Sequence, residues 1–202
     1  MSAVEVRDAM TRAARGARSG VRAFYSRPVG WMALFVTSAV LAYGGGGVMF
    51  WFHAIYRGER GPAIGDVQHW LFDSTLGFLA LTPALFLILP AGLWALERAR
   101  VGSLRAKALI YPLVVGVLFG VVTGPGPFLH DTLVGGGTPL ARMAEQVFGF
   151  DPAIAARNAE AAVHSTASSM ALQVAVGIPV YVAFGVLALW ATRAMARRWA
   201  TR

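Results

Sequence analysis

The sequence contains no cysteine and only one lysine among its 202 residues. Without thiols, the chain has no disulfide bonds, no thiolate metal ligands and no thiol redox chemistry. Charged residues make up only 14% of the sequence, whereas soluble domains usually contain about 25%. With 56% hydrophobic residues, so few charges cannot cover the surface of a soluble domain. Part of the surface is therefore expected to contact lipid.

Four stretches lack charged residues and approach or exceed the length of about 20 apolar residues that crosses a hydrocarbon core. They are 28–52, 74–96, 108–123 and 167–192. Five tryptophans lie near the ends of these stretches, where amphipathic rings favour the headgroup region: Trp31, Trp51, Trp70, Trp94 and Trp190. The sequence predicts an all-α integral membrane protein, a bundle of four transmembrane helices. Short extracytoplasmic helices are expected between the third and fourth spans.

The basic residues are distributed unequally between the two sides of these spans. Fourteen of the 18 lie in the N-terminal arm, in the loop between the second and third spans, or at the C-terminal end. Seven of the ten acidic residues lie on the opposite side. The positive-inside rule therefore predicts that both termini are cytoplasmic. Because the positive charges lie at membrane edges, the expected partner is the lipid bilayer, and nucleic-acid binding is not expected.

This topology divides the chain into three parts. Residues 1–27 form a basic cytoplasmic arm, 28–193 the transmembrane domain and 194–202 a basic cytoplasmic tail. The transmembrane domain includes two extracytoplasmic segments, 53–73 and 124–166. The first span is expected to remain uncleaved, because its apolar run continues ten residues beyond a weak cleavage-like site at Ala42. The composition, rich in arginine, alanine and glycine, is typical of a GC-rich bacterial genome, which indicates the bacterial cytoplasmic membrane.

The longer extracytoplasmic segment contains helix signals. Thr138-Pro139 is typical of an N-cap followed by proline in the first turn, and Gly149 of a helix end. Between these signals Leu140, Met143 and Val147 share one face, which predicts a short helix at the membrane interface. Asp151-Pro152 repeats the start signal and predicts an alanine-rich helix that leads into the fourth span.

All four histidines lie on the outer side, each near the end of a different span. Most have a carboxylate nearby: Asp66 and Asp73 flank His69 at helical spacing, Asp131 follows His130, and Glu160 precedes His164 by four residues. Imidazole and carboxylate together suit copper, zinc and other transition metals, and a carboxylate often orients a ligating histidine. The common depth predicts a shared site.

The predicted metal ligands are His69, His130 and His164, with His53 as a fourth candidate. Asp66, Asp73, Asp131 and Glu160 are assigned as further ligands or as residues that orient the histidines. Copper is the first choice and zinc the second, while a single outer haem b held by His53 and His164 is a weaker alternative. The competing interpretation is ordinary polarity of an outer interface, with Asp73 as the N-terminal cap of the second span.

Two groups of glycines predict close helix contact. Gly44–Gly47 either permits a close approach or marks an unwound segment that lines a cavity. Gly116, Gly120 and Gly124 form a stripe of small residues on the third span. The partner of this stripe is another span or another subunit, and we expect a homo- or hetero-oligomer formed through the membrane helices.

The leading functional hypothesis is a membrane metal-binding or redox-associated subunit with an extracytoplasmic histidine and carboxylate site. A structural or assembly subunit without a metal site is the alternative, and a membrane-embedded metalloenzyme is the third. The sequence contains no catalytic motif that decides whether the protein is an enzyme. The predicted spans contain no acidic or basic residues, which argues against a proton-coupled carrier or an ion pump.

Overall fold

The computed structural model describes residues 16, 19–56, 67–126, 128–129, 138–148 and 167–200. These residues form helices and connecting turns, without a β-strand in the described ranges. Four helices are long and apolar enough to cross a membrane: Pro28–Phe52, Trp70–Arg98, Leu104–Val122 and Met170–Trp199. The prediction of an all-α, four-helix membrane bundle is confirmed, and the chain is a multi-pass membrane protein.

The first span consists of three consecutive helical pieces: α2 (Pro28–Ala39), the π-helical turn η1 (Val40–Gly45) and α3 (Gly46–Tyr56). The other spans are α4 (Val67–Arg98), α5 (Leu104–Val122) and α9 (Ala167–Ala200). The short helix α7 (Pro139–Phe148) lies between α5 and α9 in the sequence. Its bounds confirm the helix predicted from Thr138-Pro139 and Gly149.

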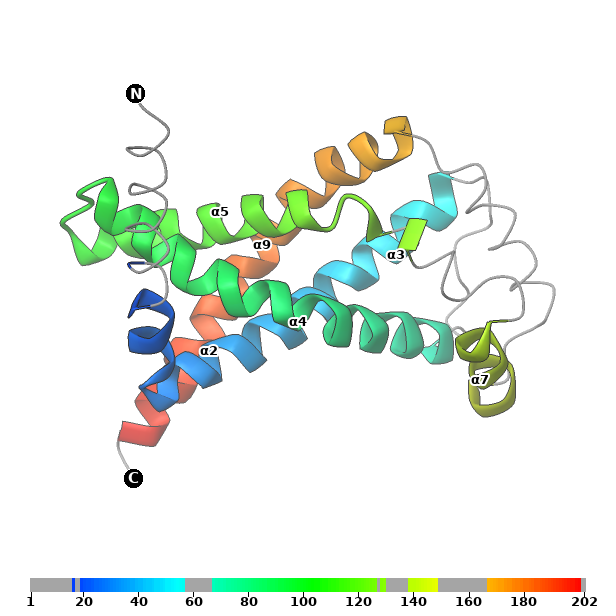
Figure 1. The fold of residues 1–202 in the computed structure, drawn as a ribbon, viewed down its shortest axis with the longest axis horizontal. Helices are drawn as coiled ribbons and strands as arrows, with labels where there is room; N and C mark the ends of the chain where they lie inside the picture. Colours follow the sequence, from blue (N-terminus) through cyan, green and yellow to red (C-terminus); the bar gives the residue numbers. More distant parts are fainter. Residues whose placement is uncertain are drawn as a thin grey trace, which may run out of the picture.

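The helices alternate in direction along the bundle (Figure 1). One end of the bundle contains the starts of α2 and α5 and the last turns of α4 and α9, and we call it the basic end. The described residues there include nine basic side chains and a single acidic one, Glu97. The basic residues are Arg22, Arg27, Arg98, Arg100, Arg105, Lys107, Arg193, Arg197 and Arg198. The opposite end, where α3 ends and α4 and α9 begin, is called the histidine end.

The glycine stripe of α5 packs against α9 of the same chain. A Cβ atom added at Gly116 would lie 2.6 Å from the Val182 Cα, and one at Gly120 would lie 2.9 Å from the Ile178 Cα. Side chains larger than hydrogen would therefore push the two backbones apart. The partner that the sequence left open is another span, and α5 and α9 form a closely packed pair.

The run Gly44–Gly47 also permits close packing. Its residues are helical, in η1 and α3, so the alternative of an unwound segment is wrong. A Cβ atom at Gly44 would meet the ring of Phe184, one at Gly45 would lie 2.9 Å from the ring of Tyr181, and one at Gly47 would lie 2.6 Å from the Trp70 Nε1. Aromatic rings from α9 and α4 fill the space that the missing side chains leave.

The bundle core contains side chains from all four spans. Leu41, Leu85, Leu89 and Phe119 are almost fully buried, and Tyr181 of α9 packs edge-on against Phe119 with ring centroids 4.8 Å apart. Large apolar side chains also face outward, among them Leu79 at 63% and Leu109 at 77% exposure. An apolar exterior around a packed core fits a lipid environment.

The helix ends differ from the predicted spans in two ways. α4 begins at Val67, seven residues before the predicted start, so Asp73 is inside the helix and the prediction that it caps the second span is wrong. α5 begins at Leu104, where the Ser103 side chain accepts a hydrogen bond of 3.0 Å from the Ala106 N–H. Both helices continue beyond the apolar run because helical hydrogen bonding does not end where the hydrocarbon core ends.

Candidate functional site

The structure describes the positions of three of the eight predicted metal-site residues. His53 lies in the last turn of α3, and His69 is the third residue of α4. Asp73 is half-buried on α4, one turn after His69 and therefore on the same helix face. The remaining five lie outside the described residues: Asp66, His130, Asp131, Glu160 and His164.

The two placed histidines come from neighbouring helices at the histidine end. The Trp70 Nε1 donates a hydrogen bond of 3.0 Å to the Tyr43 carbonyl, and the same nitrogen would lie 2.6 Å from a Cβ atom at Gly47. These contacts pack the Trp70 side chain against the first span near Tyr43 and Gly47.

His53 lies three residues before the end of α3 and His69 two residues after the start of α4, so both are close to the histidine end. Figure 1 also shows that α3 and α4 diverge toward this end. A metal ion that both side chains bind would have to bridge this separation, because metal–nitrogen bonds are only about 2.0–2.1 Å long for zinc.

The other two histidines lie between α5 and α9 in the sequence. His130 follows directly after Leu129, close behind the end of α5, and His164 precedes the first residue of α9 by three positions. α5 and α9 remain in close contact up to Gly124, where an added Cβ atom would lie 2.8 Å from the Val174 side chain. The sequence positions of His130 and His164 thus adjoin two helix ends that lie side by side.

Polar side chains are buried between α5 and α9 below these helix ends. Tyr181 is hydrogen-bonded to Thr123, and the Thr123 hydroxyl donates a hydrogen bond of 3.0 Å to the Gly120 carbonyl. Gln173, which is 4% exposed, lies on the same face of α9 as Tyr181 and closer to the histidine end. Buried polar side chains thus lie near the helix ends that adjoin His130 and His164 in the sequence.

These buried polar residues were missed in the prediction of candidate site residues. Their signal was present, because Thr123 and Gln173 interrupt otherwise apolar spans, and polar groups inside a membrane mark helix contacts or functional sites. Ser38 in α2 is a further example. It is 2% exposed, and its hydroxyl has no hydrogen-bond partner among the described residues.

The described ranges contain no group of three or more histidine, aspartate or glutamate side chains that could hold a metal ion. Five of the eight predicted residues lie outside those ranges, so the metal site remains a prediction. None of the family models, curated proteins or solved structures compared with the chain matches it. Its function has to be argued from its own residues.

Proposed function

We propose that this chain is a protein of the bacterial cytoplasmic membrane, with both termini in the cytoplasm, that binds copper or zinc at its extracytoplasmic end. It acts as a metal-binding or redox-associated membrane subunit. His69, His130 and His164 are the proposed ligands, with His53 as an additional one. Carboxylates near them in the sequence, Asp66, Asp73, Asp131 and Glu160, complete the ligand set or orient the imidazoles.

The observation that carries this proposal is the position of the histidines relative to the helix ends. α3 ends with His53 in its last turn and α4 begins with His69 in its first turn, at the same end of the bundle. His130 and His164 adjoin in sequence the ends of the other two spans at that end. The described residues at the basic end contain no histidine.

Buried polar side chains between α5 and α9 are a second reason to place the proposed site at this end. Thr123, Gln173 and Tyr181 are buried there. Buried polar groups below a ligand cluster supply hydrogen bonds that orient ligands or bound water. Copper is preferred because imidazole-rich sites suit it and because it is used outside the cytoplasm.

A structural or assembly subunit without a metal site is the second candidate. The divergence of α3 and α4 toward the histidine end favours this candidate, because it separates the helix ends to which His53 and His69 belong (Figure 1). The glycine stripe, however, faces α9 of the same chain and is not available to another subunit. This candidate therefore needs a different contact surface. A membrane-embedded metalloenzyme is the third candidate.

Metal analysis of the purified protein separates these candidates. The chain, purified without chelators and then incubated with copper or zinc and desalted, should retain one metal ion per chain. An absorption spectrum recorded on the same sample distinguishes haem, which has an intense Soret band, from a simple metal ion. Retention no greater than that of an unrelated membrane protein in the same detergent would contradict the metal site and favour the structural subunit.

A further inference from the structure

An open groove lies at the basic end between the start of α2 and the end of α9. Its volume is about 580 Å³, within the range of about 300–1,000 Å³ that small-molecule sites occupy. Apolar and aromatic side chains form most of its walls: Trp31, Met32, Phe35 and Val36 from α2, and Met195 and Trp199 from α9. Because these residues belong to the candidate spans, the groove opens toward the hydrocarbon.

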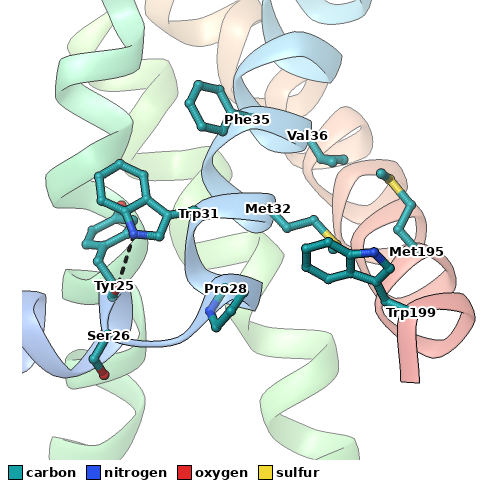
Figure 2. A pocket seen from close by; sticks show the side chains of 9 residues that line it. All are labelled: Tyr25, Ser26, Pro28, Trp31, Met32, Phe35, Val36, Met195 and Trp199. Carbon is teal, nitrogen blue, oxygen red and sulfur yellow. Dashed lines mark hydrogen bonds between the residues drawn. The ribbon is translucent and has the colours of Figure 1, made fainter. Parts of the chain in front are cut away.

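A hydrogen bond fixes one of the aromatic side chains in the groove wall. The Trp31 Nε1 donates a hydrogen bond of 2.9 Å to the Tyr25 carbonyl (Figure 2). Figure 2 also shows the Trp199 ring extending from α9 toward Met32 on α2. Trp31 and Trp199 remain 45% and 61% exposed, respectively. Large exposed rings on two different helices thus form walls around an apolar surface that the described protein does not cover.

Two exposed arginines adjoin residues of this groove in the sequence. Arg27 lies between two lining residues, Ser26 and Pro28, and is exposed. On α9, Arg198 is three residues after Met195, next to Trp199, and is also exposed. The single acidic residue among the described part of the basic end, Glu97, belongs to α4 rather than to either groove helix.

We propose that this groove binds an anionic phospholipid. One acyl chain lies between α2 and α9 against Met32, Val36 and Met195, and the phosphate lies at the membrane surface near Arg27 and Arg198. Arginine recognises phosphate through charge-assisted and often bidentate hydrogen bonds. Basic pockets at the edge of membrane helices are a recurring form of anionic headgroup recognition.

The chemistry of the groove favours a lipid over a second polypeptide. A transmembrane partner helix would be expected to pack through small residues, whereas the α2 face of the groove consists of Trp31, Met32, Phe35 and Val36. A flexible acyl chain can adapt to bulky side chains of this kind. The described part of the basic end contains nine basic residues and one acidic residue. This positive charge favours an anionic headgroup over a zwitterionic one.

Native mass spectrometry can test this assignment on the full chain. The protein is reconstituted into nanodiscs of equal parts phosphatidylglycerol and phosphatidylcholine and then released by collisional activation. The wild type should retain phosphatidylglycerol in preference to phosphatidylcholine. Trp199→Ala should lose the retained lipid, and Arg27→Gln should lose the preference for the anionic headgroup. Val36→Trp, which fills the groove without removing a wall, should lose the lipid as well.

Two variants serve as matched controls. Trp190 is on α9, is 72% exposed, and lies on the opposite face from Trp199 because nine residues correspond to about two and a half turns. Trp190→Ala should retain lipid as the wild type does, and so should Arg105→Gln, an exposed basic residue on α5. Equal retention of both lipids by the wild type would overturn the proposal. So would equal loss in the Trp199 and Trp190 variants, or a two-chain species that excludes lipid.

Discussion

The Tyr25 hydroxyl donates a hydrogen bond of 2.9 Å to the backbone carbonyl of Phe86 in α4. Pro90 lies four residues after Phe86 inside the same helix and has no N–H to offer this carbonyl. The Tyr25 ring also stacks on the Phe86 ring, with centroids 4.3 Å apart and an interplanar angle of 4°. A residue before the first span thus satisfies a backbone group that proline leaves free in the second span.

Tyr25→Phe should lower the stability of the bundle by about 0.5–1.5 kcal/mol, because it removes this hydrogen bond and retains the ring stacking. Thermal unfolding in detergent, followed by tryptophan fluorescence, measures the effect. Ser26→Ala is the control, since the exposed Ser26 hydroxyl donates only to the nearby Ala23 carbonyl. A Tyr25→Phe melting temperature equal to that of Ser26→Ala would show that the bond contributes nothing.

The difference in stability between the wild type and Tyr25→Phe should also depend on pH. Burial raises the pKa of Tyr25 from 10.0 to about 12. The unfolded chain therefore loses this proton at lower pH than the folded chain, and the stabilisation by Tyr25 is complete below pH 10 and is lost as the pH rises toward 12. The difference in melting temperature between the wild type and Tyr25→Phe should be constant from pH 7 to 9 and should shrink above pH 10. A difference that stays constant up to pH 12 would contradict this.

Gly120→Leu should destabilise the bundle by about 1–3 kcal/mol or more, because the new side chain would overlap the Ile178 backbone and force α5 away from α9. Gly77→Leu on α4 is the matched control, since a Cβ atom there has no atom within 4 Å. The control should be neutral or slightly stabilising, because leucine favours helix more than glycine does. Thermal unfolding of both variants in one detergent decides between these outcomes.

The packing of Gly44 against Phe184 can be measured with a double-mutant cycle. Gly44→Ala alone should destabilise the protein, because its Cβ would meet the Phe184 ring. In a Phe184→Ala background the same change should become neutral or stabilising, because alanine is the better helix former by about 1 kcal/mol. A coupling energy of about 0.5–3 kcal/mol is expected for residues in direct contact. Additive effects would mean that the first span does not depend on this contact.

Reporter fusions test the proposed orientation. Fusions after Arg100 and after Arg202 should report a cytoplasmic position, and one after Gly137 should report an extracytoplasmic one. The two cytoplasmic positions follow the bundle end where nine described basic residues gather. An extracytoplasmic C-terminus would require an odd number of spans and would contradict the topology on which the outer location of the histidines depends.

Much of the fold could be predicted from the sequence, because each signal was local. Uncharged apolar runs identified the four spans, and Thr138-Pro139 with Gly149 identified α7. The glycine spacing on α5 predicted a contact surface, although its partner required the structure. The bounds of α4 could not be predicted from apolarity, because helical hydrogen bonding carries Asp73 into the helix.

Features that depend on contacts between distant segments were not predictable. The rings of Phe184, Tyr181 and Trp70 fill the space beside the glycines. These rings come from other helices than the one that contains the glycines and the π-helical turn Val40–Gly45. The lipid groove likewise requires α2 and α9 to come together. The histidine pattern predicted a shared site, and this stays a prediction because five of its eight residues lie outside the described residues.

The most direct test of the central claim is the metal content per chain in histidine variants. The wild type should retain one copper or zinc ion, and His130→Ala, His164→Ala and His69→Ala should each lose most of it, because three ligands are needed to hold the ion. Arg157→Ala, a change in the same predicted extracytoplasmic segment as His130 and His164, should retain the wild-type amount. If all four variants retained as much metal as the wild type, or if the wild type retained none, the proposed metal site would be contradicted.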